Sequence, residues 1–129
     1  MEKAKTKIVT LWLMIMAGFA FHMITDVMPI FWGANVATDT SGEVPQGLVL
    51  FMMSISYLLP CAGIFCTLWS DKRLWLKVNA VFAVIAALFN LAHTAELLAG
   101  FSVAQLAILA TLDIIGILLA FESLRAAKR

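Results

Sequence analysis

Two histidines and several carboxylic acids occur in stretches of this sequence that are otherwise apolar. His22 precedes Asp26 by four residues, and in the segment FNLAHTAELLAG the residues Asn90, His93 and Glu96 follow one another at intervals of three. Residues three or four apart lie on one face of a helix, so each segment predicts a helix with a polar stripe. Neighbouring imidazole and carboxyl groups are a donor and acceptor pair suited to general acid–base catalysis.

Asp113 is a third polar position of this kind, because it stands alone in the apolar segment LATLDIIGILLA. A charged side chain at the centre of a bilayer costs at least about 2.5 to 3.5 kcal/mol on insertion scales. Such a residue needs a partner on another helix, and it often marks a functional site. We therefore expect His22, Asp26, His93 and Asp113 to be the catalytic residues.

The composition indicates which elements position these side chains. The chain has 129 residues, of which 63% are hydrophobic and 13% are charged, whereas about 25% of residues are charged in soluble domains. Four apolar runs cover residues 8–32, 48–69, 74–98 and 103–121, and each is near or above the roughly 20 residues that a helix needs to cross a bilayer. Because lipid offers no hydrogen bonds to the backbone, open sheets are excluded. The sequence predicts an all-α integral membrane protein with one domain, residues 1–129, forming an up-down bundle of four transmembrane helices.

Basic residues predict the orientation of this bundle. The nine Lys and Arg residues occur before the first run, after the second run and at the end of the chain. All nine lie on one side if the spans alternate, and the positive-inside rule assigns that side to the cytoplasm. We expect cytoplasmic N and C termini in a multi-pass protein of a bacterial-type plasma membrane. Because the charged residues are sorted by membrane side, they form no basic patch that would bind nucleic acid. The expected partner of the protein is therefore the lipid bilayer.

Prolines, tryptophans and cysteines suggest mostly structural roles. Pro60 should bend the second span, Pro29 should lie at a frayed helix end, and Pro45 is placed to open the second span. Cys61 and Cys66 are five residues apart, which on a helix points their side chains in different directions, so no disulfide between them is expected. Four tryptophans lie near predicted span ends and match an interfacial aromatic belt: Trp12, Trp32, Trp69 and Trp75.

Depth along the spans predicts where the polar side chains meet. With a rise of 1.5 Å per residue, one layer lies about 13 to 15 Å from the outer end and contains His22, Tyr57, Asn90 and Asp113. A second layer lies about 9 Å deep and contains Asp26, Ser54 and His93, with Glu96 at the rim. The inner halves of the spans look nearly all apolar. These depths predict one outward-opening polar pocket, with Ser54, Tyr57, Asn90 and Glu96 as substrate-binding residues.

Several functions fit such a pocket. The first is a small membrane enzyme that performs acid–base chemistry, namely isomerisation, cyclisation or hydrolysis, on a lipophilic small molecule. The second is a metal- or haem-binding membrane protein that uses His22 and His93 with nearby carboxylates. The depths offset these two histidines by about 6 Å, which disfavours a haem clamp.

Two further functions need a partner chain. An amphiphile transporter with Asp26 or Asp113 as its coupling carboxylate requires a homodimer, since four helices enclose too narrow a path. An accessory subunit would present its polar groups to another protein. Each polar residue also has a packing role to weigh, because a His22 and Asp26 pair or a buried Asn90 can simply fix helix contacts. The sequence leaves the substrate and any cofactor open.

Overall fold

The structure is a computed structural model, and it describes residues 1–37, 41–69, 72–97 and 103–128. The regular structure of this part of the chain is entirely helical, in agreement with the predicted all-α class. The elements, in chain order, are α1 (Glu2–Val27), the 3₁₀ turn η1 (Met28–Trp32), α2 (Gln46–Met53), the π-helical turn η2 (Ser54–Leu58), α3 (Leu59–Trp69), α4 (Arg73–Leu97) and α5 (Val103–Lys128).

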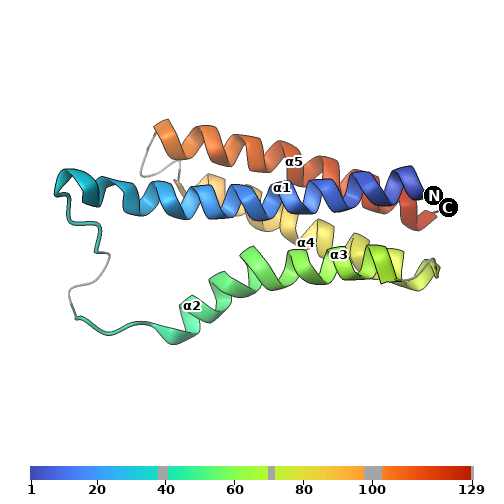
Figure 1. The fold of residues 1–129 in the computed structure, drawn as a ribbon, viewed down its shortest axis with the longest axis horizontal. Helices are drawn as coiled ribbons and strands as arrows, with labels where there is room; N and C mark the ends of the chain where they lie inside the picture. Colours follow the sequence, from blue (N-terminus) through green and yellow to red (C-terminus); the bar gives the residue numbers. More distant parts are fainter. Residues whose placement is uncertain (38–40, 70–71, 98–102, 129) are drawn as a thin grey trace.

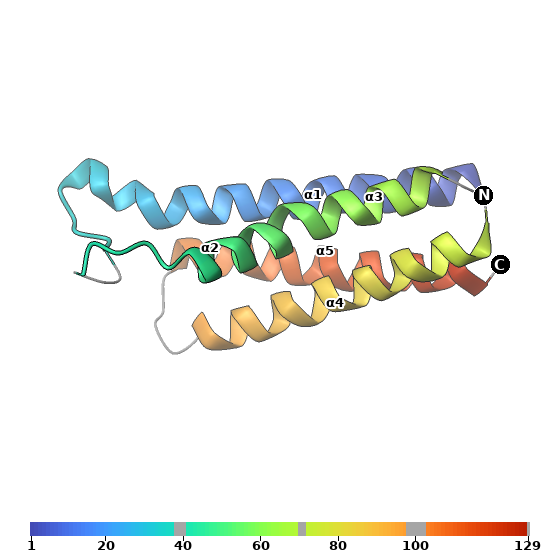
Figure 2. The same ribbon diagram turned by 90° about the horizontal axis from the view of Figure 1, so that it is seen from below.

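Four stretches are long and apolar enough to cross a membrane, which confirms the predicted multi-pass, four-span organisation. These stretches are Glu2–Trp32, Gln46–Trp69, Arg73–Glu96 and Val103–Lys128. The helices run side by side, and both chain termini lie at the same end of the bundle (Figures 1 and 2). The first and last helices extend beyond the predicted spans because their charged end residues continue the helix outside the apolar run.

Helix α5 packs against both α1 and α4 through small residues and a shared apolar core. Gly18 of α1 lies so close to α5 that a Cβ atom there would be 2.4 Å from Cδ2 of Leu112. Ala83 and Ala86 of α4 are buried in the core that α4 shares with α1 and α5. Small side chains let helix backbones approach closely, which is how helices associate in membranes, where burial from water gives no driving force.

The prediction that Trp12 lies in an interfacial belt is wrong, because this side chain is inside the bundle. Its side chain is completely buried, and its indole Nε1 donates a hydrogen bond of 2.9 Å to Oδ1 of Asn79 in α4. Asn79 in turn donates from Nδ2 to Oγ of Ser123 in α5 at 3.0 Å. The ring fits because Gly63 of α3 has no side chain to displace it. The half of the bundle at the chain termini, called the inner half as in the prediction, therefore contains a polar network, and the expectation of nearly all-apolar inner halves is wrong. The half away from the termini is called the outer half.

The second span bends near Pro60, as the sequence predicted. Proline has no amide hydrogen and its ring clashes with the carbonyl four residues before it. The chain adapts through η2, where the amide of Leu59 donates to the carbonyl of Ser54, five residues back. Helix α2, which precedes this turn in the chain, diverges from the other helices (Figure 1). All its residues are exposed except the half-buried Met52. The outer half of this span therefore packs loosely on the bundle.

The remaining structural predictions concern helix ends and cysteines. Pro29 lies in the first turn of η1, and Pro45 directly precedes α2. Cys61 and Cys66 are both free thiols. Residues 70–71 and 98–102, in the connections between the last three spans, lie outside the described residues. Trp32 and Trp69 are largely exposed, as expected for side chains at the membrane interface.

Candidate functional site

His22 and His93 meet in the outer half of the bundle. Their Nε2 atoms are 3.2 Å apart, and the ring planes are inclined by 81° with centroids separated by 5.3 Å. His22 is 5% exposed and His93 is half-buried. An imidazole nitrogen either donates or accepts, so a hydrogen bond between two Nε2 atoms requires one protonated and one unprotonated nitrogen. The pair therefore combines a proton donor and a proton acceptor.

The two histidines do not show the height offset expected from the sequence. That offset assumed that the first and third spans end at the same height. The first span, α1 with η1, reaches further past the bundle than α4 does (Figures 1 and 2). The α-helical part of this span ends at Val27 and continues as the 3₁₀ turn η1, so His22 lies close to the end of α1. Counted from the ends of the α-helices, His22 and His93 are both within the last turn and a half.

Each histidine has a carboxylate of its own helix beside it. Nε2 of His22 is 3.7 Å from Oδ2 of Asp26, and Nδ1 of His93 is 3.9 Å from Oε2 of Glu96. The other oxygen of Asp26 accepts a hydrogen bond from Nε2 of Gln105 in α5. The spacings of four and three residues in the sequence predicted these two neighbours. Gln105 was missed, although it is an amide in the first turn of its span.

Aromatic side chains surround His93 on the side of the second span. Phe89, four residues earlier in α4, stacks on the imidazole with an interplanar angle of 12° and a centroid separation of 5.9 Å. Phe51 of α2 and Phe19 of α1 contact Phe89 at centroid separations of 5.9 and 6.4 Å. The approach to the histidine pair from this side is therefore apolar, and sequence reasoning did not anticipate it.

Asn90 and Asp113 lie about one helical turn closer to the chain termini. Asn90 is 1% exposed and donates from Nδ2 to the carbonyl of Leu112 at 3.4 Å. It fits against Gly116, where a Cβ atom would be 3.2 Å from this nitrogen. Asp113 follows Leu112 in sequence, so it lies at the same level. No hydrogen bond or ion pair joins Asp113 to either histidine among the described residues.

Four buried polar atoms in this region lack a hydrogen-bond partner among the described residues. They are Nδ1 of His22, Oδ1 of Asn90, Oγ1 of Thr94 and Oδ1 of Asp113. A buried polar atom without a partner costs about 1 to 3 kcal/mol. The outer part of the bundle therefore carries unused hydrogen-bonding capacity.

Ser54 and Tyr57 do not join the layers predicted from depth. The hydroxyl of Ser54 donates to the carbonyl of Leu50 in its own helix at 2.8 Å. Tyr57 is half exposed and lines a hollow between α1 and α3 together with Leu13 and Met16. The physical reason is η2, since a π turn adds one residue and rotates the following side chains by about 100°. The second span therefore contributes no polar side chain to the histidine pair.

The described residues contain no group of three His, Cys, Asp or Glu side chains arranged to hold a metal ion. Four hollows between the helices have volumes between about 380 and 550 Å³, and neither histidine lines any of them. Comparison with known proteins finds no matching family model, no matching curated protein and no matching solved structure.

Proposed function

We propose that this protein is an integral membrane enzyme that performs acid–base chemistry on a lipophilic small molecule at the histidine pair. The observation that carries the proposal is the 3.2 Å separation of Nε2 of His22 and Nε2 of His93. One imidazole can accept a proton while the other supplies one, so the pair can move a proton between two positions of a bound molecule. Isomerisation and cyclisation suit such a pair best, because both return every proton that they remove.

Carboxylates at the edge of the pair support this role. Asp26 and Glu96 lie 3.7 and 3.9 Å from imidazole nitrogens, where a negative charge compensates the positive charge of an imidazolium. Their side chains are 44% and 85% exposed, so neither carboxylate is enclosed by the helices. Asp113 has a buried oxygen without a partner, and we assign it the role of binding or protonating a polar group of the substrate.

The surroundings of the pair favour a lipophilic substrate that enters from the membrane. Phe51, Phe89 and Phe19 line the side on which α2 diverges from the bundle. On the inner side, Trp12, Asn79 and Ser123 are all completely buried and bonded to one another. Such a closed network offers no polar route through the bundle, which favours a pocket over a transport path and gives no reason to require a homodimer.

The charge distribution supports a bacterial-type plasma membrane with cytoplasmic termini. The basic residues lie at the end of the bundle that holds both termini, and the histidine pair lies toward the other end. The positive-inside rule then directs the histidine pair toward the outer leaflet. A fusion of a reporter active only in the cytoplasm to the C terminus tests this orientation, and an inactive reporter would contradict it.

A deuterium assay tests the chemistry before the substrate is known. The purified protein is incubated in D₂O with a membrane lipid extract, and the lipids are analysed by mass spectrometry. An enzyme that removes and returns protons at carbon should leave deuterium in one lipid class. His22→Gln and His93→Gln should abolish this label, whereas Leu124→Ala, an exposed side chain near the terminal end of α5, should keep it. No labelled lipid, or full labelling by both histidine variants, would refute the proposal.

A bound metal ion is the second candidate function, and the same distance favours it. Two imidazole nitrogens bound to one tetrahedral ion at 2.0 to 2.1 Å lie about 3.3 Å apart, close to the observed 3.2 Å. Axial ligands on opposite faces of a haem would lie about 4 Å apart at similar bond lengths, which disfavours haem. Elemental analysis of the purified protein separates the two functions. One metal ion per chain in the wild type, absent from His22→Gln, would establish the metal site and rule out direct catalysis by the imidazoles.

A further inference from the structure

The seam between α1 and α3 contains two hollows that meet at Leu68. The first has a volume of about 550 Å³ and is lined by Glu2, Lys5, Thr6, Val9 and Thr10 of α1 opposite Leu68. The second has a volume of about 540 Å³ and continues along the seam between Leu13 and Met16 of α1 and Ile64 and Phe65 of α3. Because Leu68 lines both, we treat them as one groove, which we call the α1–α3 groove.

The groove changes from polar to apolar along its length. Its lining residues from α1 recur at helical intervals of three and four, so they form one continuous face of that helix. The first part of this face carries the charged and hydroxyl side chains together with Met1 and Val9, and the later residues, Leu13 and Met16, are apolar. From Lys5 to Met16 the helix rises about 16 Å, roughly half the hydrocarbon thickness of a bilayer. A charged head and an apolar chain would each find a matching part of this groove.

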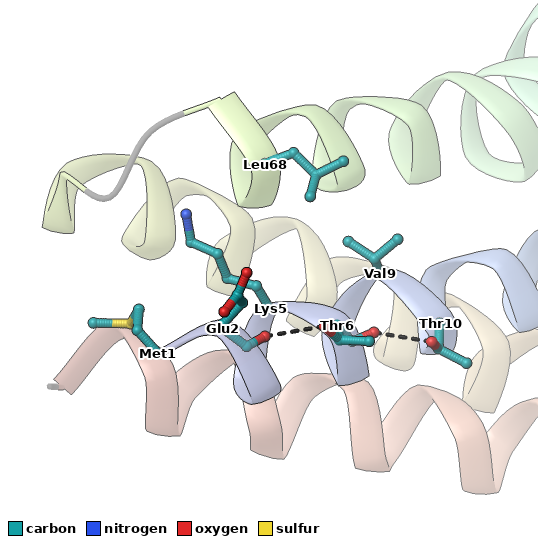
Figure 3. Close-up of a pocket in the computed structure, with 7 residues that line it drawn as sticks. All are labelled: Met1, Glu2, Lys5, Thr6, Val9, Thr10 and Leu68. Carbon is teal, nitrogen blue, oxygen red and sulfur yellow. Dashed lines mark hydrogen bonds between the residues drawn. The ribbon is translucent and has the colours of Figure 1, made fainter.

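Figure 3 shows the polar part of the groove. Lys5 and Val9 project from α1 toward the side on which Leu68 of α3 lies. The hydroxyls of Thr6 and Thr10 donate to the carbonyls of Glu2 and Thr6 at 3.1 and 2.9 Å, so their hydrogen atoms are already used within α1. Glu2 is the acidic side chain that lines it, beside Lys5.

Positive charge dominates the end of the bundle at which the polar part opens. The described basic residues at this end are Lys3, Lys5, Lys7, Lys72, Arg73, Lys77, Arg125 and Lys128. Lys7 lies 3.8 Å from Glu122, and Arg73 donates to the last carbonyls of α5. In the sequence of these segments the basic residues outnumber the acids, which are Glu2, Asp71 and Glu122, so the groove opens into a positive field.

We propose that the α1–α3 groove binds an anionic phospholipid of the leaflet at the terminal end of the bundle. Its phosphate would lie beside Lys5 and the basic residues around the groove mouth, and one acyl chain would lie along Leu13, Met16 and Phe65. Basic side chains at a membrane surface attract anionic lipid, and an apolar seam between helices holds the chain. This inference goes beyond the proposed function, because neither histidine borders the groove.

Lipid binding to the purified full-length protein tests the proposal. Native mass spectrometry at low salt compares phosphatidylglycerol with phosphatidylcholine carrying the same acyl chains. We expect the anionic lipid to bind about tenfold more tightly than the zwitterionic lipid, and Lys5→Gln to reduce this ratio roughly fivefold. Lys128→Gln is the matched control, since it removes a charge at the same end of the bundle without lining the groove, and it should change the preference less than twofold.

A second variant tests the apolar part. Val9→Trp fills the groove beside Leu68 and should weaken the binding of both lipids. Circular dichroism checks that this variant keeps its helix content. Equal binding of the two lipids would overturn the proposal. Equal effects of Lys5→Gln and Lys128→Gln would also overturn it, because they would show general attraction to the positive end and no specific groove.

Discussion

Substituting Gly63 by alanine tests how α1 and α3 fit together. A Cβ atom at this position would lie 2.3 Å from Cε2 of Trp12 and 2.5 Å from its Nε1, and such contacts force the ring to move. The ring is completely buried, and its Nε1 is bonded to Asn79 at 2.9 Å, so any shift strains that bond. Overpacking costs about 1 to 3 kcal/mol, and an interhelical hydrogen bond in a membrane contributes about 0.6 to 1.7 kcal/mol. Gly63→Ala should therefore lower the free energy of unfolding by about 2 to 4 kcal/mol.

Unfolding of the purified protein in detergent by added sodium dodecyl sulfate, followed by circular dichroism, measures this loss. Gly47→Ala in α2 is the matched control, because no atom lies within 4 Å of a Cβ there. Replacing glycine by alanine inside a helix stabilises by about 0.5 to 1 kcal/mol, so the control should be slightly more stable than the wild type. If both variants behaved alike, the close contact between Gly63 and Trp12 would be refuted.

Three further substitutions have definite expected outcomes. Asn79→Leu removes the partner of Trp12 and should lower the free energy of unfolding by about 1 to 3 kcal/mol in the same assay; an unchanged value would contradict the network. Arg73→Gln frees the carbonyl of Ala127, so hydrogen exchange at the end of α5 should accelerate while the free energy of unfolding falls by less than about 1 kcal/mol. Pro60→Ala should turn η2 into α-helix, and faster exchange of its amides than in the wild type would contradict that.

The number and positions of the spans could be predicted because they depend on each segment alone. A run of apolar residues long enough to cross the bilayer forms a helix whatever its neighbours are. The direct contact of His22 and His93 was not predicted, because depths counted along the spans placed the two histidines in separate layers about 6 Å apart. Periodicity did place Asp26 and Glu96 beside them.

Features that depend on rotation or on distant partners could not be predicted. The depth of Tyr57 was estimated without knowing that η2 adds a residue and turns the side chain out of the bundle. Trp12 was assigned to the interface from the average behaviour of tryptophan, whereas the space opposite it is created by Gly63 in another span. The sequence contains both residues, but nothing local in it pairs them.

The bundle contains two buried polar clusters, and they differ in how completely their hydrogen bonds are satisfied. In the inner cluster Trp12 donates to Asn79, which donates to Ser123, so each described member has a partner. Around the histidine pair, four buried polar atoms have none among the described residues. A polar group without a partner in an apolar environment is costly, so a network that serves only packing should be complete. The inner cluster meets that condition and is explained by stability alone. The outer cluster does not, and a bound molecule with polar groups of its own would supply the missing partners, which is why we locate the chemistry there.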